Sequence, residues 1–134
     1  MLDHTDAMPT ITDWIDAQTT PPTTFTRERT KALPLRFDGW EIAQAVRHLD
    51  RGDTPEPRII VVRIYVTTTA KLVTEVALQH GDKIQGATVA AHDDPPAALQ
   101  ALHERGGLPP ASAEAWLAAC QVVPALEPFR YERV

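Results

Sequence analysis

The sequence predicts an α+β fold: a mainly antiparallel sheet of three to five strands with two or three helices, the C-terminal two packed on one face. Three observations predict it. Residues 58–66 and 72–79 are rich in β-branched side chains, which favour strands. The segment "GATVAAH", residues 86–92, predicts a third strand. Two segments with prolines at their starts, residues 93–107 and 109–122, then have the pattern of helices.

Length and composition indicate one globular domain. The 134 residues fit a single domain, residues 1–134, in which residues 1–24 form an N-terminal helix and a Pro/Thr-rich loop. The net charge of −5 opposes non-specific attraction to nucleic acid and to anionic membranes. One cysteine cannot form an intrachain disulfide, and the acidic N-terminus does not resemble a signal peptide. We therefore expect a cytoplasmic protein.

The segment "RIIVVRIYVTTTAKLVTEVALQH", residues 58–80, is the most apolar part of the chain. Arg63, Lys71 and Glu75 lie near its middle and exclude a membrane span. Residues 58–66 are apolar on both alternating faces except at Arg63, which predicts a central strand covered on both sides. Residues 72–79 alternate more clearly, which predicts a half-exposed strand. We expect this strand pair to hold no reactive groups.

The loop between these two strands decides which side chains share a face. An odd-numbered loop at residues 67–71 assembles one apolar face from alternate residues of both strands. Those residues are Ile60, Val62, Ile64 and Val66 opposite Leu78, Val76, Thr74 and Leu72. The loop contains no glycine, so either it is longer than two residues or Ala70 adopts a strained conformation.

The other N-terminal segments are shorter. Residues 10–18 predict an amphipathic helix capped by Thr10 or Thr12. Residues 25–37 predict an edge strand or a broken strand, because Pro34 cannot donate a ladder hydrogen bond. Residues 40–49 fit either a helix or a strand.

The C-terminal part predicts two helices and a last strand. In residues 93–107, Asp93 or Asp94 is the expected N-cap, and Gly106-Gly107 the expected stop. In residues 109–122, we expect Trp116, Leu117 and Cys120 to face the core. The final residues, 128–134, suggest an edge strand.

Short motifs in the middle and C-terminal parts resemble a known family. The matching residues are Phe37 and Gly39 for "F-x-G"; Arg63, Tyr65, Thr67 and Lys71 for "R-x-Y-x-T-x-K-G"; and Leu108, Pro109 and Pro110 for a "V-P-P-E-L" helix. The sequence thereby resembles the C-terminal region of the bacterial EXLDI protein family over residues 36–127. The N-terminal ribbon-helix-helix of that family has no counterpart here. The resemblance implies a companion domain alone and favours a strand for residues 40–47.

Two groups of residues are candidate binding sites. A pocket between sheet and helices would use Trp40, Tyr65, His92 and Trp116 for a ligand. A basic-aromatic segment at residues 25–36 would use Arg27, Arg29, Lys31 and Arg36 for nucleic acid.

Other polar motifs have simpler interpretations. His92-Asp93-Asp94 could hold a divalent metal, but it is also typical of a capped helix start, which we favour. His80 with Asp82 is more typical of a solvated turn, and the Arg-Gly-Asp triplet at residues 51–53 of a chance match to an adhesion motif. We predict no metal site and no cofactor.

The sequence contains no phosphate loop, nucleophile elbow or HExxH motif, and Cys120 falls on the apolar side of its helix. It therefore predicts no catalytic residue. We expect a non-enzymatic small domain that acts through protein contact, as a homodimer or as a subunit of a regulatory assembly. The alternatives are a ligand-binding domain or small enzyme with a pocket between sheet and helices, and nucleic-acid binding through residues 25–36.

Overall fold

The computed structural model describes residues 9–49, 57–104 and 106–131. Five antiparallel strands follow one another in the order of the sequence and form one curled sheet. They are β1 (Thr23–Arg29), β2 (Ala32–His48), β3 (Arg58–Thr67), β4 (Leu72–His80) and β5 (Lys83–His92). The helices are α1 (Ile11–Asp16), α2 (Pro95–Leu102), α3 (Pro110–Val122) and the 3₁₀ helix η2 (Pro124–Phe129). The predicted α+β class is confirmed.

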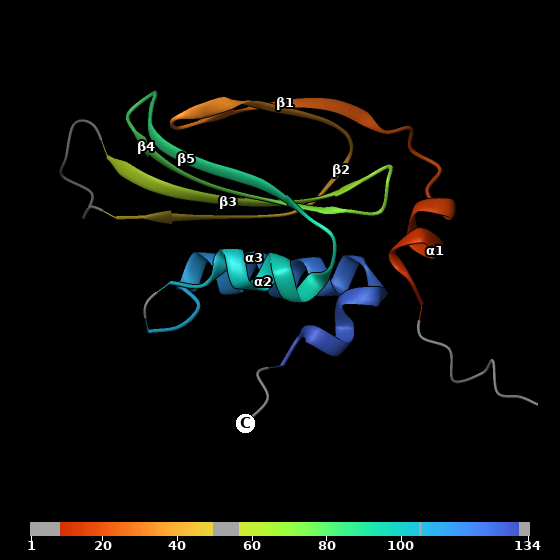
Figure 1. The fold of residues 1–134 in the computed structure, drawn as a ribbon. Coiled ribbons are helices and arrows are strands. Elements are labelled where there is room, and N and C mark those ends of the chain that lie inside the picture. The colour runs from red at the N-terminus through yellow and green to blue at the C-terminus, as the bar shows by residue number, and fades with distance from the viewer. Residues whose placement is uncertain (1–8, 50–56, 105, 132–134) are drawn as a thin grey trace, which may run out of the picture.

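The sheet has an inner face, on the inside of its curl, and an outer face. Figure 1 shows β1 curving back over the rest of the sheet, while α2 and α3 lie together on the other side. In the described part of the chain, no helix is both long and apolar enough to cross a membrane.

The curl originates in the long strand β2. Its first half pairs with β1 and its second half with β3. Between the halves lies Gly39, where a β-carbon would overlap the carbonyl oxygen of Val66, so the close crossing requires glycine. A β-bulge between Glu41 and Ala43 adds to the bend. The β1–β2 hairpin consequently folds over the inner face.

A second contact fastens the end of β1 to β5. The Thr30 backbone N–H donates to the Ala87 carbonyl oxygen at 3.0 Å, and the Ala87 N–H donates to Thr30 Oγ1 at 2.9 Å. Arg29 Nη1 also donates to the Val89 carbonyl oxygen at 3.4 Å. Strand β1 therefore covers the inner face of the sheet.

The central strand pair has the predicted register. Strand β3 lies in the middle of the sheet, and Ile60, Val62, Ile64 and Val66 stand opposite Leu78, Val76, Thr74 and Leu72. The Ala70 N–H donates to the Thr67 carbonyl oxygen at 3.0 Å, and Ala70 has φ 66°. The loop is therefore longer than two residues and also places Ala70 in the left-handed region.

The expectation that residues 72–79 form a half-exposed strand is wrong. Val73, Glu75 and Ala77, which were expected to face water, have exposed fractions of 0%, 4% and 1%. They lie on the inner face, which the folded-over β1–β2 hairpin covers. Side-chain alternation in the sequence indicates that one face of a strand is apolar. It does not indicate that the sheet curls and so covers the opposite face as well.

The two faces contribute to two separate cores. On the outer face, Val62, Ile64 and Leu72 belong to the large cluster that includes Leu102 and Trp116 of the helices. On the inner face, a smaller cluster joins the strands to one another. Its members are Tyr65, Val73 and Val89 with the partly buried Phe25, Leu35 and Phe37.

Several N-terminal predictions can be compared directly. The helix within residues 10–18 is confirmed as α1, with Thr10 as N-cap in a capping box with Asp13. Residues 40–48 are strand, so the helical alternative is wrong. Residues 25–37 comprise most of the edge strand β1 and the start of β2, joined by a turn in which Lys31 has φ 63°. Pro34 lies in β2 beside an irregularity of the β1–β2 pairing.

The C-terminal predictions are confirmed in part. Asp94 caps α2, but the helix ends at Leu102, before Gly106-Gly107. Trp116 and Cys120 are buried, whereas Leu117 is 43% exposed and does not face the core. Residues 128–131 continue from η2 into a bend, so the expected strand at 128–134 is wrong there. Residues 132–134 and the Arg-Gly-Asp triplet at 51–53 lie outside the described residues.

Candidate functional site

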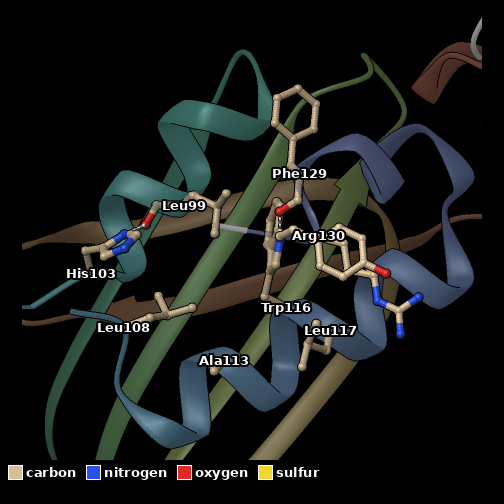
Figure 2. A pocket seen from close by; sticks show the side chains of 9 residues that line it. Leu99, His103, Leu108, Ala113, Trp116, Leu117, Phe129 and Arg130 are labelled. Atoms are coloured by element: carbon tan, nitrogen blue, oxygen red, sulfur yellow. Dashed lines mark hydrogen bonds between the residues drawn. The ribbon is translucent and has the colours of Figure 1, made fainter. Parts of the chain in front are cut away.

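An open pocket lies between α2, α3 and the C-terminal segment (Figure 2). We call it the helical-face pocket. Its volume is about 230 Å³. Its lining residues are Leu99, His103, Leu108, Ala113, Trp116, Leu117, Phe129, Arg130 and Tyr131. Figure 2 shows Leu99 and Leu108 on one side of Trp116, with Phe129 and Arg130 of the C-terminal segment on the other.

The pocket is held in shape by hydrogen bonds to main-chain oxygens. The Trp116 indole Nε1 donates to the Phe129 carbonyl oxygen at 3.0 Å, which fastens the C-terminal segment to α3. Proline at both ends of the "PALEP" turn keeps the chain from continuing as an α-helix. On the opposite wall, His103 Nδ1 lies 2.8 Å from the Leu99 carbonyl oxygen.

The chemistry of this pocket suits an apolar group. Its aliphatic and aromatic side chains form the walls, while His103 and Arg130 supply polar edges. Arg130 Nη1 pairs with Glu127 Oε1 at 3.3 Å, so both signs of charge occur at the edge. Leu117 and Tyr131 are 43% and 69% exposed, and both line the pocket. The site therefore offers a hollow and exposed apolar side chains within one surface.

A second cluster lies on the inner face, and we call Arg27, Arg63, Tyr65 and Glu75 the inner polar cluster. The Tyr65 hydroxyl donates to Glu75 Oε1 at 2.6 Å. Arg27 Nε donates to the Tyr65 hydroxyl at 2.8 Å and lies 3.4 Å from Glu75 Oε1. Arg63 Nη1 pairs with Glu75 Oε2 at 3.4 Å. Both carboxylate oxygens of Glu75 therefore have cationic partners.

The centre of the inner polar cluster is closed to water, whereas the side chains of Arg27 and Arg63 are 30% and 24% exposed. Tyr65 is 0% and Glu75 4% exposed. Burial, reinforced by the hydrogen bond to Glu75, raises the pKa of Tyr65 well above its ordinary value, so the phenol stays a neutral donor. The central strand pair, which was expected to hold no reactive groups, carries the ionisable side chains Tyr65 and Glu75, and both are engaged with partners inside the cluster.

Sequence reasoning singled out two members of the inner polar cluster but assigned them to different sites. Tyr65 was expected in the ligand pocket and Arg27 in a nucleic-acid surface. The strand register could have predicted part of this cluster, because the odd-numbered loop sets Arg63 opposite Glu75. Tyr65, two residues from Arg63, then falls on the same face. The contribution of Arg27 depends on the folding over of β1, which has no local signal.

The four residues predicted to line a ligand pocket lie in different places. Tyr65 is on the inner face, and Trp116 contributes to the helical-face pocket. Trp40 packs edge-to-face against Trp14, with ring centroids 5.6 Å apart, and its Nε1 donates to the Thr20 carbonyl oxygen at 2.9 Å. The structure therefore does not bring Trp40, Tyr65 and Trp116 together.

His92, the fourth of these residues, is held at the end of β5. Its Nε2 lies 2.8 Å from Thr74 Oγ1, and burial lowers its pKa below the ordinary histidine value. The two aspartates that follow have other partners. Asp93 pairs with Lys71 Nζ at 2.9 Å, and Asp94 Oδ1 accepts from the Ala97 N–H at 2.8 Å. Among the described residues, no group of three acidic, histidine or cysteine side chains could hold a metal ion.

The basic residues of the predicted nucleic-acid surface are divided between two faces. Arg27 belongs to the inner polar cluster, and Arg29 donates to main-chain oxygens of Leu33 and Val89. Arg36 lies on the opposite face of the hairpin, where its Nε donates to Thr26 Oγ1 at 3.0 Å. Lys31 occupies the turn. The four cations therefore do not form one continuous patch.

Cys120 is enclosed in the outer core. Its side chain is buried, and Sγ lies 3.5 Å from the Leu126 carbonyl oxygen. Burial raises its pKa to about 11, so the thiolate is scarce at neutral pH. This environment is that of a packing residue.

The chain was compared with models of protein families, with curated proteins and with solved structures, and no match was found in any of them.

Proposed function

We propose that this chain is a non-enzymatic domain that acts through protein contact and pairs with a second copy of itself through the helical-face pocket. The observation that carries the proposal is the combination of a hollow with exposed apolar side chains at its edge. Leu117 and Tyr131 are large apolar or aromatic residues that project beside the pocket they line. Tyrosine is enriched in protein interfaces, because it combines a large apolar area with a polar end.

A second copy fits this surface for a geometric reason. In a two-fold interface the same patch serves on both partners, so a hollow must lie beside a projection that can enter it. The helical-face pocket meets this condition, with Leu117 and Tyr131 as the projections. The edge of the pocket also carries two opposite charges, Arg130 and Glu127. Across a two-fold axis, each of them can face the opposite charge of the second copy.

The inner polar cluster supports a non-enzymatic role. A catalytic acid or base must come within hydrogen-bonding reach of its substrate. Tyr65 is 0% exposed, and both oxygens of Glu75 are already engaged by Tyr65 and the two arginines. The cluster has the features of a buried ion pair that fixes the curl of the sheet.

The proposal includes kinship with the companion domain of the EXLDI family and a cytoplasmic regulatory assembly. Residues that carry this resemblance have structural roles along the curl. Gly39 permits the crossing of β2, Arg63 and Tyr65 bind Glu75, and Thr67 closes the β3–β4 turn. A related chain would need the same residues to build the same curl.

The test is the oligomeric state of the protein and of two matched variants, measured by sedimentation equilibrium over a range of concentrations. Leu117 and Val122 lie on the same helix with exposed fractions of 43% and 44%, but Val122 is outside the pocket lining. We expect a dimer for the native chain and for Val122→Glu, and a weakened dimer for Leu117→Glu, because the charge would be buried in the interface. A native chain that stays monomeric at high concentration would contradict the proposal, as would equal effects of both variants.

A further inference from the structure

A second cavity, distinct from the helical-face pocket, lies between the outer face of the sheet and the start of α3. We call it the sheet–helix cavity. Its volume is about 260 Å³, and it adjoins a smaller cavity of about 130 Å³ with which it shares Val76, Glu104 and Ser112. Ile60, Val62 and Val76 form an apolar wall along β3 and β4. One side of this space therefore suits an aliphatic chain.

Ser112, on the opposite side, has a hydroxyl that opens onto the cavity and has no protein partner in the described chain. It is 3% exposed and lines both cavities. Its hydroxyl makes no hydrogen bond within the described residues. Among the described residues, no fully buried side-chain oxygen or nitrogen lacks a hydrogen-bond partner, so the Ser112 oxygen is accessible from the cavity. A hydroxyl in this position is available to a ligand that enters the cavity.

The first turn of α3 adds two main-chain donors beside this hydroxyl. Helix α3 has no side-chain cap, and its first residue is Pro110, which has no N–H. The Ala113 N–H donates to the Pro109 carbonyl oxygen at 2.9 Å, whereas the N–H groups of Ala111 and Ser112 have no main-chain acceptor in the described chain. Three donors, two amides and one hydroxyl, therefore gather at the positive end of a 13-residue helix.

The charges around the sheet–helix cavity limit the ligand to a single negative charge. Arg47 lines the cavity and pairs with Glu114 through Nη2 and Oε1 at 3.1 Å, with about half of each side chain exposed. Glu104 also lines the cavity. One guanidinium and the helix end favour an anion, while two neighbouring carboxylates disfavour a dianion such as phosphate.

From these observations we infer that the sheet–helix cavity binds a small aliphatic monocarboxylate. The carboxylate accepts hydrogen bonds from Ser112 and from the free amides of α3, with Arg47 nearby. The alkyl chain lies along Ile60, Val62 and Val76. This site is separate from the proposed dimer surface, since the two cavities share no lining residue.

The test uses methyl NMR titrations of the full chain with butanoate and hexanoate. Each buried methylene contributes a factor of about four in affinity, so hexanoate should bind roughly fifteen-fold more tightly than butanoate. The shifts should concentrate at the methyls of Ile60, Val62 and Val76. 1-Hexanol, which has the same chain without the charge, should bind at least tenfold more weakly than hexanoate.

Two variants and a control assign the binding to this site. Ser112→Ala should weaken hexanoate about tenfold by removing one donor to a charged group. Val76→Phe should abolish binding by filling the cavity, and Gln121→Ala, at the exposed far end of α3, should leave it unchanged. The inference is overturned if hexanoate does not saturate, if Ser112→Ala binds like the native chain, or if inorganic phosphate binds more tightly. Shifts confined to Leu117 and Leu99 would assign the ligand to the helical-face pocket and also overturn it.

Discussion

Two polar residues with little exposed surface, Glu75 at the inner face of the sheet and Ser112 at the outer face, differ in their hydrogen bonding. On the inner face, Glu75 is almost fully buried and is bonded to Tyr65 and to two arginines. On the outer face, Ser112 of α3 is also little exposed, but its hydroxyl opens onto the sheet–helix cavity and, within the described chain, has no partner.

The difference separates a polar group that serves the fold from one that is available for binding. A buried group that already has its partners contributes to the structure and has little left to offer a ligand. A donor that opens onto a cavity and has no protein partner can still be given one by a ligand. Stability measurements on the two faces can therefore distinguish the two roles.

The largest effect is expected at the apolar centre of the outer face. Val62 is 0% exposed, so Val62→Asp would bury an unpaired charge. We expect a loss of several kcal/mol against a total stability of about 5–15 kcal/mol, enough to unfold the domain. Circular dichroism during thermal melting would show this. Ile84→Asp, at a position 52% exposed on β5, is the control and should melt almost normally; a normal melt of Val62→Asp would refute the central position of β3.

The next effect concerns the charged centre of the inner face. Glu75→Ala would leave Arg27 and Arg63 without their shared carboxylate, at a cost of about 3 kcal/mol. Urea unfolding would measure the loss. Glu41→Ala is the matched control, because Glu41 lies 3.8 Å from Arg63 and its side chain is 34% exposed; the expected loss is below about 1 kcal/mol. Equal losses for both variants would mean that the buried pair has no special role.

The smallest effect on the free energy of unfolding is expected at Ala70. This residue lies in the β3–β4 turn, which sets the register and so decides which side chains share a face. Ala70 has φ 66°, a conformation that costs a non-glycine residue about 1 kcal/mol. Ala70→Gly should therefore raise the free energy of unfolding by roughly 0.5–1 kcal/mol. Ala91→Gly, in β5, has no positive φ to relieve and should lower it by a similar amount. A destabilised Ala70→Gly protein would argue against the left-handed turn.

Local patterns predicted much of the fold. Alternation and β-branching located β3, β4 and β5, and the odd-numbered loop gave the register of Arg63 opposite Glu75. The curl was not predictable, because it depends on Gly39 meeting the backbone of Val66, a residue 27 positions later in the chain. Without the curl, Glu75 was expected to be exposed and Arg27 to be a free surface cation.

The binding surfaces were harder to predict for the same reason. Trp116 was identified as a pocket residue, but the C-terminal segment that completes the helical-face pocket was expected to be a strand. The missing protein partner of the Ser112 hydroxyl is visible only once α3 is packed against β2 and β3.

The most direct test of the contrast between the faces is to measure the free energies of unfolding of Tyr65→Phe and Ser112→Ala side by side, without ligand. Tyr65→Phe removes the hydrogen bond to buried Glu75 and should cost about 1–3 kcal/mol. Ser112→Ala removes a hydroxyl with no partner and should cost nothing or raise stability slightly. A loss for Ser112→Ala as large as that for Tyr65→Phe would contradict the account, because both hydroxyls would then serve the fold.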